Sequence, residues 1–189
     1  MRQDDEQAYI AELEEYRRWR DEAFRAHPDS PVPQDLRGAA FGGLAYFPIA
    51  HTYCVEATLT PHPVPEVVPL GSTQGDVREQ LRFGELTFQL GGAKCRLAAF
   101  KDAGDPDGAV LFVPFRDTTS GHETYAAGRY VEPRDSGKGT QPRAVVVDFN
   151  LAYNPYCAYD ARFSCTLPPA ENSLPVPVTA GERTYDSGH

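Results

Sequence analysis

The stretch QLRFGELTFQLGGAKCRLAAF, residues 80–100, decides the fold. Two runs with recurring apolar side chains, 80–90 and 93–100, are separated only by Gly91 and Gly92. A glycine pair between two such runs is typical of a β-hairpin, because both central residues of the favoured tight turn adopt positive φ angles. The stretch therefore predicts two antiparallel strands joined by a two-residue turn.

Short segments of the same kind lie on both sides of this hairpin, with turn sequences such as DPDG (105–108) and DSGKG (135–139) between them. The other predicted strands are 44–47, 53–60, 67–70, 109–115, 123–132, 143–150 and 176–179. No segment with helical periodicity interrupts the series, which favours an antiparallel sheet over alternating α/β units. We therefore expect a mainly β fold, either an antiparallel β sandwich or a β barrel.

One amphipathic α-helix, residues 5–26, is predicted to precede the strands and to pack on them. Pro28 ends it, because the residue before a proline avoids the helical conformation. Arg20 lies within the apolar side, so we expect it either to pair at the contact between helix and sheet or to point toward a ligand. The apolar residues share one half of the helical wheel at a period of 3.6 residues: Tyr9, Ile10, Leu13, Tyr16, Trp19, Ala23 and Phe24.

The length of 189 residues suits a single domain. Within it we expect the helix, a connector rich in proline and glycine over 27–43, and a β domain over 44–189. The net charge of −9 argues against a nucleic-acid or anionic-membrane partner, because both kinds of binding rely on a basic face. The absence of a signal-peptide pattern and of a long apolar run predicts a cytoplasmic protein.

Strand alternation predicts where polar side chains gather. A hairpin of 111–117 with 123–131 around TTSG would place Asp117 about 16 Å from Arg129 along the ladder, so no direct pair is expected between them. A second hairpin of 123–132 with 143–150 would bring Arg129 close to Asp148, and Tyr125 close to Asn150. Both hairpins together predict one polar patch, with the loop that carries Tyr153 above it.

This predicted patch has two interpretations. As a ligand site it would bind a small polar or anionic ligand, with Arg129 binding an anionic group. This interpretation also allows an enzymatic step, although no catalytic residue is assigned. As a structural network it would only stabilise the end of the core, and the chain would be a structural or protein-interaction module. The candidate ligand-binding residues are Asp117, Tyr125, Arg129, Asp148, Asn150 and Tyr153.

The cysteines do not predict a metal site. Cys157 and Cys165 are separated by seven residues, and no further cysteine or histidine lies near them at zinc-ligand spacing. We expect two reduced, buried thiols, with a disulfide or a nucleophilic Cys157 as the less favoured alternatives. Neither a P-loop nor a GxGxxG motif is present, so no cofactor is predicted.

Several segments together resemble a bacterial and archaeal family known as domain of unknown function 1684. The segments are HPDSPVP (27–33), GGLAYFPIAHTY (42–53), LFVPFRDTTSGHETYAAGRYVE (111–132), VVVDFNLAYNPYCAYDARFSCTLPPAEN (145–172) and LPVPVTAGER (174–183). The chain resembles the short form, which lacks the additional N-terminal β region of longer members. The resemblance implies a mostly β cytoplasmic domain and brings no established activity, cofactor or catalytic residue.

Overall fold

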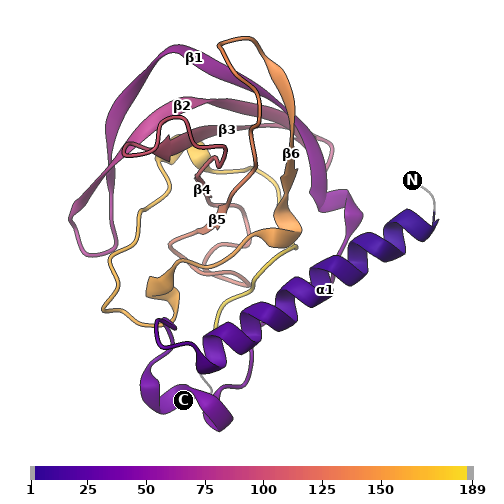
Figure 1. The fold of residues 1–189 in the computed structure, drawn as a ribbon, viewed down its shortest axis with the longest axis vertical. Coiled ribbons are helices and arrows are strands. Elements are labelled where there is room, and N and C mark those ends of the chain that lie inside the picture. The colour runs from indigo at the N-terminus through magenta and orange to yellow at the C-terminus, as the bar shows by residue number, and fades with distance from the viewer. Residues whose placement is uncertain (1–2, 187–189) are drawn as a thin grey trace.

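The structure is a computed structural model that describes residues 3–186. One long helix, α1 (Gln3–Ala26), precedes all strands and crosses one side of the β structure (Figure 1). This confirms the predicted N-terminal helix. No helix among the described residues is both long and apolar enough to cross a membrane. The other helical segments are short 3-10 turns: η1 (Gln34–Leu36), η2 (Gly38–Ala40), η3 (His51–Tyr53), η4 (Phe149–Leu151), η5 (Tyr156–Ala158) and η6 (Ala170–Asn172).

The strands of the described residues form two antiparallel sheets. The larger sheet has the order β3-β2-β1-β6, with β1 (Cys54–Gly71), β2 (Val77–Leu90), β3 (Ala93–Asp102) and β6 (Arg143–Asp148). The smaller sheet contains β4 (Val113–Phe115) and β5 (Arg129–Val131). These strands do not close into a barrel, so the prediction of a mainly antiparallel β fold is confirmed in its open, two-sheet form.

The hairpin of β2 and β3 forms as predicted. Leu90 pairs with Ala93, and the two residues between them, Gly91 and Gly92, have φ angles of 58° and 80°. Such angles are unfavourable for residues with a Cβ, which is why the glycine pair marks the turn.

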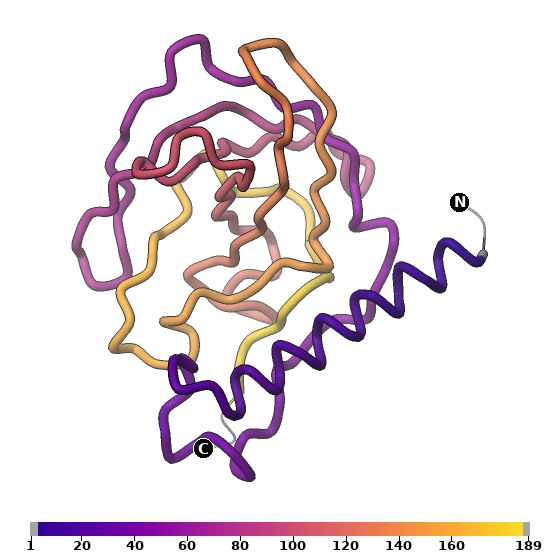
Figure 2. Tube along the Cα trace, in the orientation of Figure 1, coloured from indigo at the N-terminus to yellow at the C-terminus, as the bar shows by residue number. Residues whose placement is uncertain are grey.

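Side chains from both sheets meet in one apolar core. Leu86 of β2, Leu97 of β3 and Val113 of β4 have no exposed surface, and alternate residues along each strand of the larger sheet point inward. Val178 and Ala180, from a segment without regular structure, are equally buried in this core. Figure 2 shows that segment, in yellow, running from the interior of the molecule toward α1.

Helix α1 is held by apolar and polar contacts. Leu13 and Phe24 are buried, and Phe24 packs on Tyr159 with their ring centroids 5.0 Å apart. Arg20 forms a 2.6 Å ion pair with Glu182, which is the first of the two roles expected for it. Trp19 was expected on the packed side, but 63% of its surface is exposed.

Several predicted strands need correction. The predictions 53–60 and 67–70 form the single strand β1, because a register shift between Pro61 and Glu66 lets the chain continue past the prolines. Beyond Leu59 this strand has no pairing with β6, so the missing proline N–H groups interrupt no hydrogen bonds on that side. Segments 44–47 and 176–179 are not strands, and only 129–131 of the predicted strand 123–132 is extended and paired.

Candidate functional site

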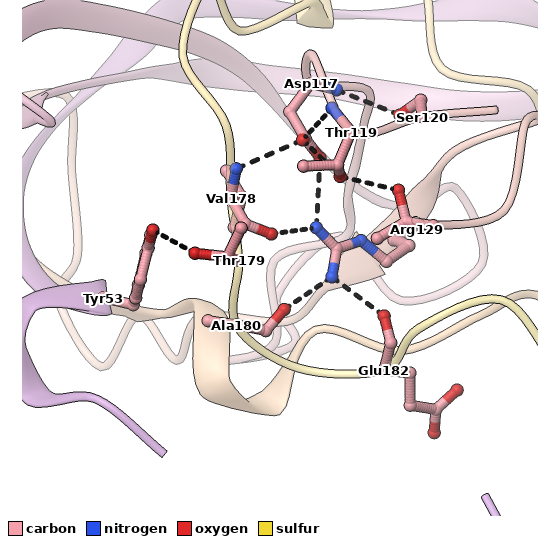
Figure 3. Close-up of polar contacts among 10 residues, drawn as sticks. Tyr53, Asp117, Thr119, Ser120, Arg129, Val178, Thr179, Ala180 and Glu182 are labelled. Atoms are coloured by element: carbon pink, nitrogen blue, oxygen red, sulfur yellow. Dashed lines mark hydrogen bonds and ion pairs between the residues drawn. The ribbon is translucent and has the colours of Figure 1, made fainter. Parts of the chain in front are cut away.

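Arg129 and Asp117 form a closed ion pair inside the protein. Arg129 Nη2 lies 3.0 Å from Asp117 Oδ2, and each side chain is only 1% exposed. The guanidinium also donates to the carbonyl oxygens of Val178, Ala180 and Glu182 at distances of 2.8, 2.5 and 3.0 Å (Figure 3). Burial lowers the pKa of Arg129, and the neighbouring Asp117 acts against this shift. No side of this pair is open to a ligand.

The second carboxylate oxygen of Asp117 is also satisfied within the fold. Asp117 Oδ1 accepts hydrogen bonds from the Thr119 backbone at 2.8 Å, the Thr119 hydroxyl at 2.6 Å and the Val178 backbone at 3.1 Å. Figure 3 shows the carboxylate pointing at the segment that carries Val178. These contacts match the structural interpretation of this part of the predicted patch.

The expectation that Asp117 and Arg129 do not pair was wrong. It assumed a tight hairpin around TTSG, which sets Arg129 about five residues along the ladder from Asp117. In the structure Phe115 lies opposite Arg129, and the intervening residues 116–128 form a wide loop. Asp117 is therefore only two residues beyond the position opposite Arg129, which is within reach of a long side chain.

The second predicted hairpin, of 123–132 with 143–150, does not form, so Asp148 and Asn150 lie elsewhere. Strand β6 pairs with β1, and Asp148 is opposite Cys54. Asp148 accepts a 2.8 Å hydrogen bond from the Tyr9 hydroxyl of α1. The Asn150 side chain binds the backbone of Ala50 through both its oxygen and its nitrogen. These two residues therefore fix the helix and the chain before β1, away from Arg129.

The two predicted tyrosines occupy two further places. The Tyr125 hydroxyl lies 3.3 Å from the Cys157 carbonyl oxygen and 3.6 Å from its Sγ. The Tyr153 hydroxyl donates to Glu132 Oε1 over 2.5 Å, and burial raises the pKa of Tyr153 so that it stays a neutral donor. The six candidates thus fall into four separate environments instead of one patch.

Two adjoining cavities lie beside α1. The larger has a volume of about 920 Å³, and the smaller one of about 760 Å³. Both cavities are lined by Tyr16, Glu132 and Tyr153, so the two are adjacent along the helix. Among the six predicted residues, Tyr153 lines both cavities and Asp148 lines the smaller one. Small-molecule sites typically have volumes of about 300–1,000 Å³, so each cavity is of suitable size.

The larger cavity, which we name the aromatic cleft, has aromatic rings in its walls from α1, the smaller sheet and the segments 109–112 and 153–166. Tyr130 is packed edge-to-face against Phe112 and Tyr153, with ring centroids 4.8 and 5.7 Å away. Trp19 stacks on Tyr16 at the exposed rim. The aromatic residues of the lining are Tyr16, Trp19, Phe112, Tyr130, Tyr153, Tyr156 and Phe163.

The charges of the aromatic cleft are unbalanced. Its two arginines are each paired with a carboxylate outside the lining, Arg20 with Glu182 at 2.6 Å and Arg78 with Asp76 at 3.2 Å. Its three carboxylates, in contrast, form no ion pair with any residue in the described part of the chain. They are Asp102, Asp105 and Glu132. A cation near the aromatic faces would therefore meet an attractive potential.

Sequence reasoning missed most of this cleft, because its residues come from five separate segments of the chain. The high aromatic content of the sequence, with ten tyrosines and ten phenylalanines, was the available signal. All four cysteines are free thiols. Within residues 3–186 no group of three histidine, cysteine, aspartate or glutamate side chains is close enough to hold a metal ion.

The fold and the cleft define a mainly β protein with an N-terminal helix and an open, aromatic-walled cavity. Residues 39–183 match the model of the family described as "Protein of unknown function (DUF1684)". The chain belongs to this family, which confirms the resemblance seen in the sequence.

A solved structure of an uncharacterised protein from Haloarcula marismortui is similar to the chain over nearly its whole length. The two sequences are 42% identical, the TM-score is 0.75, and the match covers 97% of this chain and 98% of the other. No curated protein shows significant sequence similarity to the chain.

Proposed function

We propose that the protein binds a small polar ligand with a flat or cationic group in the aromatic cleft. The observation that carries this proposal is the cavity of about 920 Å³ with seven aromatic side chains in its lining. Aromatic faces attract cations and flat groups, and the unpaired carboxylates supply complementary charge.

The preference for an anionic ligand no longer has support. It rested on Arg129, whose guanidinium is buried and bound to Asp117 and three carbonyl groups. The other arginines at the cleft are paired with carboxylates, so binding an anion there would require breaking an ion pair. A polar neutral or cationic ligand meets no such cost.

Trp19 supplies a direct experiment, because it is the one tryptophan of the chain and lies at the rim of the aromatic cleft. The full chain is titrated with three probes of similar size: benzyltrimethylammonium, benzyl alcohol and benzoate. We expect the cation to change Trp19 fluorescence and to bind at least about tenfold more tightly than benzoate, since a desolvated cation–π contact alone contributes about 2 kcal/mol.

Two variants locate the binding. Tyr156→Ala removes an aromatic wall of the cleft whose side chain is 45% exposed, so it should weaken cation binding at least about fivefold while leaving the fold intact. Val67→Ala changes another exposed apolar side chain away from the cleft and should bind as the unaltered chain does. If neither fluorescence nor melting temperature responds to any probe, or if the two variants bind equally, the proposed function is wrong.

A further inference from the structure

Cys157 and Cys165 approach each other in the loop that forms one wall of the aromatic cleft. The Cys157 backbone N–H donates to the Sγ of Cys165 over 3.2 Å. Cys165 lines the cleft, whereas Cys157 is 8% exposed and lies behind it. A thiol that faces the cavity and a buried thiol are thus direct neighbours.

The sulfur of Cys157 lies close to polar groups. The Tyr125 hydroxyl lies 3.6 Å from it, and the neighbouring Cys165 thiol lowers its pKa. The hydrogen bond from Cys165 is the largest cause that lowers the pKa of Cys157 to about 6, against the opposing effect of burial. The same interaction raises the pKa of Cys165.

Cys95 is a buried thiol of the apolar core and serves as a comparison for Cys157 and Cys165. It is 2% exposed within the core, and its thiol donates a hydrogen bond to the carbonyl oxygen of Ala93 over 3.8 Å. Burial raises the pKa of Cys95, as expected for a thiol used as a small apolar group. The polar surroundings of Cys157 and Cys165 are therefore not a general property of buried cysteines here.

We propose that Cys157 and Cys165 form a redox-active thiol pair, which a small hydroperoxide entering through the aromatic cleft oxidises to an intramolecular disulfide. The observations behind this pair are independent of the ligand proposed for the cleft. Hydrogen peroxide is close to water in size, so the cavity of about 920 Å³ that Cys165 lines has room for it. Reduction by a small thiol would return the pair to its starting state.

The chemistry balances in two steps. The Cys157 thiolate attacks one oxygen of the peroxide, an S–O bond forms, the O–O bond breaks, and the leaving hydroxide takes a proton from solvent. The Cys165 sulfur then attacks the sulfenic sulfur of Cys157, the S–S bond forms, the S–O bond breaks, and hydroxide leaves with the Cys165 proton as water. In sum, two thiols and one peroxide give one disulfide and two water molecules.

Trypsin allows an unambiguous test, because Arg162 lies between the two cysteines. Complete digestion places Cys157 in the peptide 144–162 and Cys165 in the peptide 163–183, and neither peptide has a second cysteine. The full chain is treated with hydrogen peroxide, alkylated, digested without reductant and analysed by mass spectrometry. We expect the two peptides to appear as one disulfide-linked species that a reductant separates.

Cys54 serves as the internal control, because it is partly exposed and burial raises its pKa. Cys157 should lose its reactivity toward the alkylating reagent at least about tenfold faster than Cys54, since a larger thiolate fraction reacts faster with peroxide. In Cys165→Ser the linked species should be absent and Cys157 should be trapped as its sulfenic acid by a cyclic 1,3-dione. Oxidation of Cys54 without any linked peptide, or no dione adduct on Cys157 in that variant, would overturn the proposal.

Discussion

Arg129 and Asp117 hold a segment of the chain that lies far from both in sequence. Their side chains are each 1% exposed, and together they bind the backbone of Val178 through both its N–H and its C=O. Arg129 also donates hydrogen bonds to the carbonyl oxygens of Ala180 and Glu182. The Glu182 side chain in turn forms an ion pair with Arg20 of α1. One buried network thus connects the smaller sheet, the interior segment and the helix.

Replacing Arg129 by methionine should strongly destabilise the fold. The change leaves the Asp117 carboxylate buried without its counter-ion and three carbonyls without donors. We expect a loss of about 3–5 kcal/mol in the free energy of unfolding, measured by urea denaturation. The control is Arg96→Met, which breaks an exposed ion pair with Glu85 and should cost at most about 1 kcal/mol. Equal losses in the two variants would refute a structural role for Arg129.

Gly181→Ala tests how closely the interior segment is packed. Gly181 has a φ of 73°, and an added Cβ would lie 2.4 Å from the Ala152 carbonyl oxygen and 2.7 Å from that of Phe149. Because both obstacles are backbone atoms, we expect a destabilisation of at least about 3 kcal/mol. Gly139 has a similar φ of 77°, but a Cβ added there would meet no atom within 4 Å. Gly139→Ala should therefore cost only about 1–2 kcal/mol. Thermal unfolding of both variants separates the steric effect from the conformational one.

Asp135 should make stability depend on pH in the acid range. Hydrogen bonds from Arg143 lower the pKa of Asp135, so its stabilisation is present above its unfolded pKa of about 4 and is lost as the pH falls through the folded value. Asp135→Asn should therefore lower the free energy of unfolding by about 1–3 kcal/mol at pH 7. The difference from the unaltered chain should shrink as the pH falls below about 4. A difference that stays constant from pH 7 to pH 2 would contradict this assignment.

The packing of helix α1 on the fold should contribute to stability through Phe24 and not through Trp19. Phe24 is 6% exposed and packs on Tyr159, whereas Trp19 is 63% exposed. We expect Phe24→Ala to cost about 3–5 kcal/mol. Trp19→Ala should change the free energy of unfolding by no more than about 0.5 kcal/mol. Urea denaturation followed by circular dichroism measures both values, and a large effect of Trp19→Ala would show that the rim of the cleft supports the fold.

Local features of the fold were predictable from the sequence because they depend on neighbours along the chain. The β2–β3 turn follows from Gly91 and Gly92, which both need positive φ angles. The end of α1 follows from Pro28, and the pairing of Arg20 with a carboxylate follows from its position within an apolar helix side.

The candidate site was not predictable in the same way, because its geometry depends on pairing between distant segments. DSGKG resembles a hairpin turn, yet β6 pairs with β1, whose residues lie about 90 positions earlier along the chain. A shift of two to three residues in the pairing of β4 with β5 was enough to separate Asp117 from Arg129 in the prediction. The aromatic cleft required α1, β2, the smaller sheet and two loops to be placed together, which no local pattern encodes.

The interior position of residues 178–182 has a consequence for synthesis on the ribosome. Every strand is translated before this segment, but Arg129 and Asp117 find most of their partners only within it. Until the segment leaves the exit tunnel, a nascent chain carries a charged pair without its final hydrogen bonds and a core without Val178 and Ala180. Folding of this protein is therefore expected to finish after translation of the segment, as a late and cooperative step rather than strand by strand.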